Sequence, residues 1–126
     1  VLTTAYSSRS PKPYLPGYAA FKAALNNLTK TLAKDYGPHG VRVNAVAPGA
    51  IRTGRYDERL AAMRTADPDV PLAEAEARML EAMGMCVALN RIGEPGEVAD
   101  MIAFLLSERA AYATGVIANV DGGTDF

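Results

Sequence analysis

A tyrosine and a lysine stand four residues apart in the stretch GYAAFKAALNNLTKTLAKDYG, which has the composition of a helix. Residues four apart share one face of a helix, so the Tyr18 phenol and the Lys22 ammonium are expected to lie close together. A phenol ordinarily keeps its proton to about pH 10, and a nearby ammonium and a helix N-terminus both favour its ionised form. Such a phenol can exchange a proton with an alcohol or ketone oxygen, so the pair suits carbonyl–alcohol redox chemistry. Two ordinary surface residues at a common spacing are the alternative.

The elements that would position this pair alternate between strands and helices. Three β-branched runs predict strands at residues 1–4, 41–47 and 116–120. Apolar residues at helical spacing, with Gly and Pro at the boundaries, predict the helices. These are expected at residues 18–36, 55–65, 72–83 and 97–107.

This order of elements predicts an α/β fold in which parallel strands are joined by crossover helices. Three strands make a thin sheet, whereas a parallel sheet is normally covered on both faces. The expected architecture is therefore half of an open α/β sheet. In the long helix, Phe21, Leu25, Leu28 and Leu32 form one apolar stripe, which could pack on the sheet or pair with a second subunit.

The composition argues against several classes of partner. The 126 residues carry 13 basic and 14 acidic side chains, and this balance favours neither nucleic acid nor an anionic membrane. No apolar run approaches the ~20 residues of a membrane span. With Cys86 as the only cysteine, no internal disulfide can form, and a reducing, cytoplasmic setting is expected. His39 lies in a Pro-His-Gly turn as a surface residue, and no residues have metal-ligand spacing, so we expect no metal.

Four motifs in sequence order resemble the C-terminal half of a short-chain dehydrogenase/reductase. They are Tyr-x-x-x-Lys at residues 18–22, VRVNAVAPG at 41–49, RIGEPGEVA at 91–99, and Gly115 followed by VDGG at 120–123. The resemblance implies the C-terminal half of a Rossmann-like, doubly wound parallel sheet with three strands and crossover helices. It covers essentially the whole chain and is weakest between residues 55 and 90.

The resemblance also implies an activity. Enzymes of this family move a hydride between NAD or NADP and a secondary alcohol or carbonyl compound. It assigns the acid/base role to Tyr18, and it assigns to Lys22 both assistance to the tyrosine and binding of the nicotinamide ribose. The implied partners are a small alcohol or carbonyl substrate and further copies of the chain in a homo-oligomer.

The segment that follows the second strand is expected to border the nicotinamide. By resemblance, Pro48 and Gly49 shape this wall, the Ile51 backbone meets the carboxamide, and the Thr53 hydroxyl lies near the carboxamide or the phosphates. Residues 55–90 follow the carboxyl end of a strand, where ligands bind in such folds, and are expected to form a substrate-binding lid. Four methionines of this region could line an adaptable pocket or simply fill the core. They are Met63, Met79, Met83 and Met85.

The sequence departs from the family at the catalytic serine. The family places this serine thirteen residues before the tyrosine, and here that position is Ala5. A shortened loop would let Ser7 take over the role; otherwise the hydroxyl is absent. Loss of one such hydrogen-bond donor costs roughly 10²–10³ in rate. The alternative function is therefore a non-catalytic nucleotide-binding or scaffold protein, a pseudoenzyme on the same fold.

The glycine-rich turn that holds the dinucleotide phosphates in this family has no counterpart in the sequence. The expectation is that residues 1–126 are a partial NAD(P)-binding domain that lacks its N-terminal, phosphate-binding half. Alone, they should neither bind a dinucleotide tightly nor turn over substrate.

Overall fold

Three short strands form one parallel sheet in the computed structural model, which describes residues 1–124. The strands are β1 (Leu2–Thr3), β2 (Ala45–Pro48) and β3 (Ile117–Val120), and β2 lies in the centre. Ala45 marks the register, because it pairs with Leu2 on one side and with Ile117 on the other. The predicted fold class, α/β with a three-stranded parallel sheet, is confirmed.

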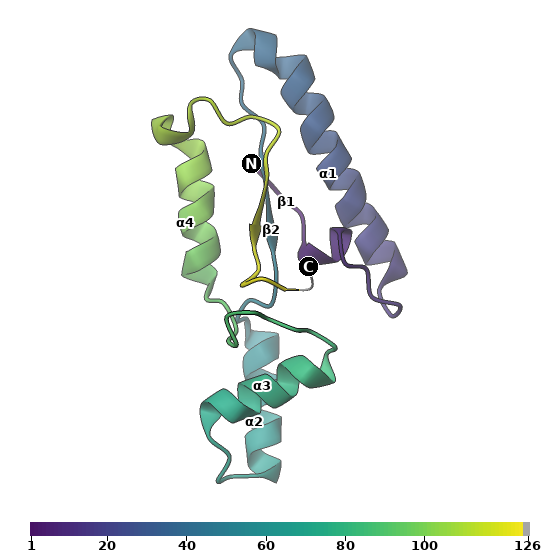
Figure 1. The fold of residues 1–126 in the computed structure, drawn as a ribbon, viewed down its shortest axis with the longest axis vertical. Helices are drawn as coiled ribbons and strands as arrows, with labels where there is room; N and C mark the ends of the chain where they lie inside the picture. The colour runs from purple at the N-terminus through teal and green to yellow at the C-terminus, as the bar shows by residue number, and fades with distance from the viewer. Residues whose placement is uncertain (125–126) are drawn as a thin grey trace.

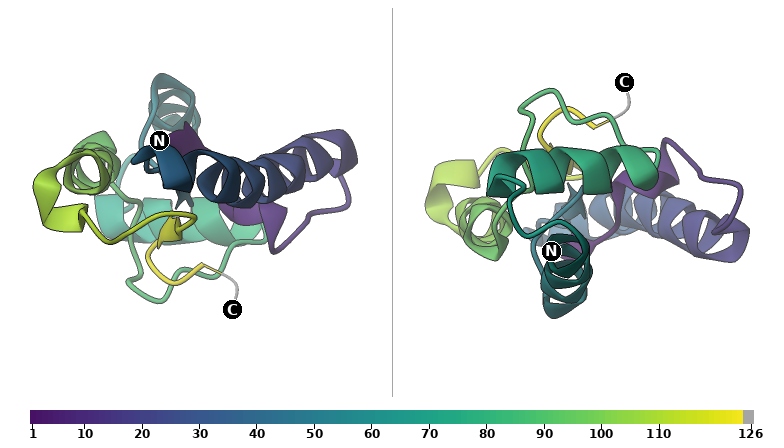
Figure 2. Two further views of the ribbon diagram at one scale, coloured as in Figure 1. Left: turned by 90° about the horizontal axis from the view of Figure 1, so that it is seen from above. Right: turned by 90° about the horizontal axis from the view of Figure 1, so that it is seen from below.

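Two helices flank the sheet on opposite sides, and two others lie beyond the carboxyl ends of its strands (Figure 1). The flanking helices are α1 (Pro16–Tyr36) and α4 (Pro95–Leu106), which the left view of Figure 2 shows on either side of the strands. The pair beyond the strand ends is α2 (Gly54–Ala66) and α3 (Leu72–Ala82). Short 3-10 helices are η1 (Tyr6–Ser8), η2 (Gly37–His39) and η3 (Glu108–Ala110).

The strand predicted at residues 41–47 begins later than expected, at Ala45. The residues before it make isolated backbone bonds, from Leu2 to Asn44 and from Gly115 to Val43, and several side-chain bonds. The Arg42 guanidinium donates to three carbonyls at the C-terminal end of α4. Asn44, only 1% exposed, donates to the Ala113 carbonyl and accepts from the Val116 amide. The segment before β2 is therefore fixed to α4 and to the start of β3 without belonging to the sheet.

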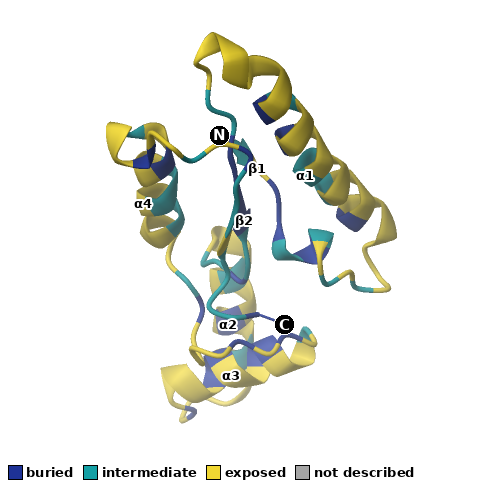
Figure 3. Ribbon diagram, turned by 45° about the horizontal axis from the view of Figure 1, so that its top comes forward, coloured by how far each residue is buried: buried dark blue, intermediate teal, exposed yellow. Residues whose placement is uncertain are grey.

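The apolar stripe of α1 is divided between two surroundings, since Leu25 and Leu32 are partly buried and the other two members are exposed. Phe21 is 78% exposed and Leu28 is 43% exposed, so both face outward. The buried residues of α1 are Ala19, Thr29 and Ala33, and Figure 3 shows the exposed outer face along most of the helix. Small side chains let a helix approach the strands closely, whereas Phe21 and Leu28 remain uncovered in this chain.

The largest apolar cluster of the described residues lies around α2 and α3 rather than under the sheet. Methionine contributes to it, since Met79 is 2% exposed and Met85 is 6% exposed. For Met79, the interpretation as core filler is confirmed, whereas Met85 also lines a cavity. Tyr6, Tyr56, Met63 and Met83 pack against the cluster and are partly buried. Its buried members are Ala50, Leu60, Val70, Ala75, Met79, Leu80, Met85, Val87 and Ile92.

The first turn of α4 is held by a reciprocal pair of side chains. Glu94 caps the helix, Pro95 occupies its first position, and the Glu97 carboxylate accepts a bond from the Glu94 amide. The Arg91 guanidinium also binds Glu97, at 2.5 and 2.9 Å. This ion pair, together with the Glu94 amide, lowers the pKa of Glu97 to about 2.

Acid should therefore weaken the start of α4. A carboxyl with a lowered pKa stabilises the fold fully above its ordinary pKa of 4.5, and this contribution is lost as pH falls toward 2. We expect Glu97→Gln to be less stable at neutral pH and to lose less stability than the native chain on acidification. Urea unfolding followed by circular dichroism at a series of pH values measures both. Parallel pH dependences for the two proteins would contradict this assignment.

Candidate active site

The carboxyl ends of the three strands bring distant segments together. Gly49, after β2, packs so closely on Asp121, after β3, that a Cβ at position 49 would lie 2.6 Å from the Asp121 Cβ. Any larger residue here would push the two segments apart. Arg9, which follows η1, donates to the Asp121 carboxylate at 2.7 Å. These contacts tie the segments after all three strands into one edge, the place where open α/β sheets bind ligands.

Tyr18 and Lys22 lie together at the N-terminal end of α1. The Lys22 Nζ is 5.5 Å from the centre of the Tyr18 ring, so the predicted common face exists. Tyr18 is 48% exposed, which leaves the phenol accessible. The ammonium also donates to the Thr3 carbonyl at 2.9 Å. This carbonyl faces away from β2, because the neighbouring residues Leu2 and Thr4 make the bonds to that strand.

The turn after β1 contains one unsatisfied hydroxyl. Ser7 is 2% exposed, and its Oγ has no hydrogen-bond partner in the described part of the chain. The next serine, Ser8, is fully engaged, since it donates to the Ala5 carbonyl and accepts from Asn26. Ala5, at the usual serine position, is buried and offers no hydroxyl. An unpaired buried hydroxyl is costly, and the described residues leave the Ser7 Oγ unsatisfied.

The segment from Pro48 to Thr53 presents backbone groups as well as side chains. Gly93 forms a parallel bridge with Ile51 by bonding through both of its own peptide groups, to Ala50 and Arg52. In such a bridge the amide and carbonyl of the opposite residue, here Ile51, point the other way. The Thr53 side chain is exposed at the N-cap position of α2 and makes no capping bond. These groups fit the carboxamide and phosphate contacts expected of a nicotinamide dinucleotide. The glycine at position 49 has a structural reason as well, because a side chain there would collide with Asp121.

Arg52, which sequence reasoning did not single out, binds three carboxylates from three helical elements. It donates to Glu94 at 2.8 Å, to the buried Glu76 at 2.5 Å and to Asp57 at 3.3 Å. These four residues are called the Arg52 cluster below. The carboxylates, Glu94 foremost, raise the pKa of Arg52 above its ordinary value. The cluster joins the segment after β2 to α2, to α3 and to the cap of α4.

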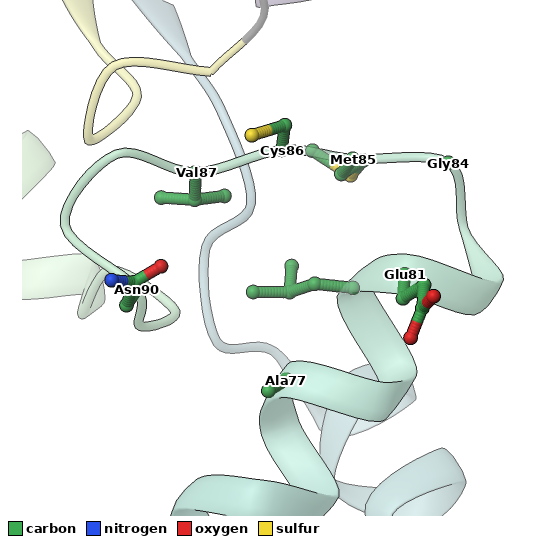
Figure 4. A pocket seen from close by; sticks show the side chains of 8 residues that line it. Ala77, Glu81, Gly84, Met85, Cys86, Val87 and Asn90 are labelled. Carbon is green, nitrogen blue, oxygen red and sulfur yellow. The ribbon is translucent and has the colours of Figure 1, made fainter.

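Two cavities of about 400 Å³ accompany these segments. One lies at the ends of β2 and β3, where Ile51, Asn119 and Asp121 contribute to its wall. The other lies between α3 and the chain that follows it, and Figure 4 shows Glu81, Cys86 and Asn90 around it. Neither is lined by Tyr18 or Lys22, so in the described residues the pair stands on an open surface rather than inside a closed pocket.

A parallel sheet between crossover helices, with a tyrosine–lysine pair at the head of one helix, defines an α/β protein of the doubly wound type. A family model described as enoyl-(acyl carrier protein) reductase matches residues 1–125. The chain belongs to the short-chain dehydrogenase/reductase family, as its sequence motifs indicate.

Among curated relatives, protein FixR of Bradyrhizobium diazoefficiens is 44% identical over 106 residues, which are 84% of this chain and 31% of that protein. The 3beta-hydroxysteroid dehydrogenase 1 of Eggerthella lenta is 42% identical over 90% of this chain and 38% of the enzyme. The chain thus spans less than half the length of these relatives.

Solved structures give the same picture. A short-chain oxidoreductase from Pseudomonas aeruginosa, described as containing an atypical catalytic center, superposes with a TM-score of 0.85 at 30% identity, over 96% of this chain and 45% of that one. L-sorbose reductase from Gluconobacter frateurii, solved with NADPH and L-sorbose, gives a TM-score of 0.80 at 30% identity, over 96% and 44%.

Removal of the Arg52 guanidinium should destabilise the fold more than removal of an exposed one. Arg52→Met leaves the Glu76 carboxylate, whose side chain is 12% exposed, without this partner, and we expect a loss of about 1–3 kcal/mol in unfolding free energy. Arg78→Met is the matched control, because its partners Glu74 and Asp67 are about half exposed, and its effect should be clearly smaller. Urea denaturation measures both. Equal losses for the two variants would contradict the structural importance of the Arg52 cluster.

Proposed function

We propose that this chain carries the catalytic residues of an NAD(P)-dependent oxidoreductase, which moves a hydride between the nicotinamide and a secondary alcohol or carbonyl substrate. The observation that carries the proposal is the Tyr18–Lys22 pair, with the ammonium 5.5 Å from the phenol ring. Family membership supports it, as do relatives named as dehydrogenases and solved neighbours that contain NADPH.

Tyr18 is the proposed acid/base. When an alcohol is oxidised, its hydroxyl proton passes to the Tyr18 oxygen; when a carbonyl is reduced, the phenol returns a proton to the substrate oxygen. The Lys22 ammonium, which lies beside the Tyr18 ring, offers N–H donors to ribose hydroxyls. The Ser7 hydroxyl is the proposed donor to the substrate oxygen, in place of the serine that Ala5 replaces.

The proposed cofactor is NAD or NADP, and its nicotinamide ring supplies or accepts the hydride. Pro48 and Gly49 would shape the wall beside the ring, the Ile51 backbone would bind the carboxamide, and the Thr53 hydroxyl would bind the carboxamide or a phosphate oxygen. Support comes from the Ile51 peptide groups, which point away from Gly93, and from the exposed Thr53 side chain.

Residues 55–90, which include α2 and α3, are the proposed substrate-binding lid. Tyr6, from the turn that carries Ser7, packs against the apolar cluster around α2 and α3. The substrate itself is proposed only as a small alcohol or carbonyl compound, because the region presents no distinctive set of polar groups that would recognise a particular one.

Residues 1–126 are proposed to be a partial NAD(P)-binding domain that is inactive in isolation. The curated relatives named above are more than twice as long as the part that matches, and the sequence has no glycine-rich phosphate-binding turn. We propose that this turn lies in a part of the full-length protein that corresponds to the unmatched residues of the relatives.

Two further predictions concern the setting of the protein. A homo-oligomer is proposed, and the exposed apolar side chains Phe21 and Leu28 on α1 support it, because a second subunit would cover them. A cytoplasmic location stays a prediction. Of the helices in residues 1–124, none is both long and apolar enough to cross a bilayer.

The second candidate function is a pseudoenzyme, a nucleotide-binding or scaffold protein without turnover. Ala5 favours it, because a buried alanine replaces the expected hydroxyl. A similar solved oxidoreductase is described as having an atypical catalytic center, so departures from the usual residues occur in similar proteins that are called oxidoreductases. The unpartnered Ser7 hydroxyl favours the enzyme over this alternative.

The acid/base role predicts that Tyr18→Phe removes turnover in the full-length protein that carries this sequence. Phenylalanine keeps the ring and loses only the hydroxyl that exchanges the proton, so a rate loss of about 10²–10⁴ is expected. NAD(P)H consumption with a panel of ketones, aldehydes and sugars measures it. Tyr36→Phe, at the far end of the same helix, is the matched control. Undiminished turnover in Tyr18→Phe would refute the assignment.

The identity of the hydroxyl donor is tested by two substitutions made separately. If Ser7 is the donor, Ser7→Ala lowers kcat by about 10²–10³ while cofactor affinity changes little. If the site has instead lost its donor, Ser7→Ala has no effect on kcat and Ala5→Ser raises it. Calorimetric binding of NADPH, run beside the rate measurements, separates a change in catalysis from a change in cofactor binding.

A further inference from the structure

The loop between η1 and α1 reaches across to the carboxyl end of α3. The Lys12 Nζ donates to the Gly84 carbonyl at 2.8 Å, and the Tyr14 hydroxyl donates to the Met83 carbonyl at 3.2 Å. These two bonds are called the loop–α3 contact below. The right view of Figure 2 shows the purple loop beside the end of the horizontal helix α3.

The two acceptors of the loop–α3 contact are carbonyls at the C-terminal end of α3, which favour a cation and a hydroxyl as donors. The last carbonyls of a helix lack partners within the helix and carry partial negative charge. α3 ends at Ala82, so the Met83 and Gly84 carbonyls extend from this end. An ammonium and a phenolic hydroxyl are donors that satisfy them, and a cation is favoured at this pole of the helix.

The α2–α3 pair is therefore attached to the rest of the chain in two different ways. At the Arg52 cluster, ionic bonds from one guanidinium reach α2, α3 and the cap of α4, and the Glu76 carboxylate is buried. At the loop–α3 contact, the acceptors are neutral carbonyls, and the Tyr14 residue is 61% exposed. Charged, buried bonds are harder to break than bonds from exposed side chains to carbonyls. The loop–α3 contact is the weaker attachment.

The weaker attachment lies next to the proposed site. Tyr6 packs against the apolar cluster of α2 and α3, and the next residue is Ser7, whose buried hydroxyl has no partner in the described chain. The loop that carries Lys12 and Tyr14 leads directly into α1, which begins at Pro16, two residues after Tyr14, and has Tyr18 in its exposed first turn. Movement of α3 away from this loop would uncover the Ser7 turn from the same side.

We propose that Lys12 and Tyr14 are positioning residues, which hold the carboxyl end of α3 against the loop and the Ser7 turn, and that the substrate enters when these two bonds open while the Arg52 cluster stays intact. The substrate part of this inference rests on the proposed function. The mechanical part concerns only the chain as it stands, and it can be tested without cofactor or turnover.

Hydrogen–deuterium exchange of the full-length protein that carries this sequence, without substrate and read by mass spectrometry, tests the proposal. In Lys12→Met/Tyr14→Phe we expect exchange in α3 and η1 to become about tenfold faster than in the native chain, because each lost bond lowers the free energy of local opening. Exchange in β2 and β3 should not change. Lys34→Met/Tyr36→Phe is the matched control, since it changes the same residue types at exposed positions at the far end of α1 and should leave α3 and η1 unchanged.

Two conservative variants keep the test sharp. Lys12→Arg retains a cationic donor and should preserve slow exchange in α3, whereas Tyr14→Phe alone should give a smaller increase in the same peptides. Native exchange rates in α3 of the double variant would overturn the proposal. So would equal acceleration in β2 and β3, which would indicate general destabilisation, or acceleration in Lys12→Arg as large as in the double variant. None of these outcomes depends on catalysis, so this proposal and the proposed function can fail separately.

Discussion

The arrangement of the site depends on one guanidinium. Arg52 stands between Ile51 and Thr53, whose free groups border the proposed cofactor side, while its own side chain reaches Glu76 and Glu94 on other elements. A buried carboxylate must keep its cationic partner, so the segment after β2 cannot move independently of α3 and the cap of α4. The wall of the site and the helices beyond the sheet are therefore one mechanical unit. The backbone of Ile51 and Thr53 is thus held in place by the Arg52 side chain, which points away from the proposed cofactor.

The sheet brings the strand ends close together but contributes few large apolar side chains to the core. Ala45, Val46 and Ala47 in β2 are fully buried, yet two of the three are alanines, and Gly49 has no side chain at all where Asp121 touches it. Small residues let the strand ends approach one another, and they leave little apolar area to stabilise the sheet. The large apolar side chains gather instead around α2 and α3. The part of the chain proposed to move for substrate also contains its best-packed core.

The order of elements, the parallel sheet and the pairing of Tyr18 with Lys22 were all predictable, because apolar periodicity and helical spacing are local properties of a sequence. The start of β2 was not, since it depends on the bonds of Arg42 and Asn44 to segments more than sixty residues away. The outward direction of Phe21 could not be predicted, because apolar periodicity in a helix does not show whether the sheet or another subunit covers that face. Arg52 could have been found: in an extended segment, its side chain must point opposite to those of its two neighbours, and acidic residues recur downstream.

The Lys22 ammonium occupies an acceptor that belongs to the sheet. The Thr3 carbonyl lies on the outer edge of β1, where in a wider sheet a backbone amide of a fourth strand would bond it. A carbonyl oxygen has two lone pairs, so a strand added at this edge and the Lys22 ammonium would share one acceptor. The outer edge of β1 and the position of the lysine are thereby linked through a single oxygen.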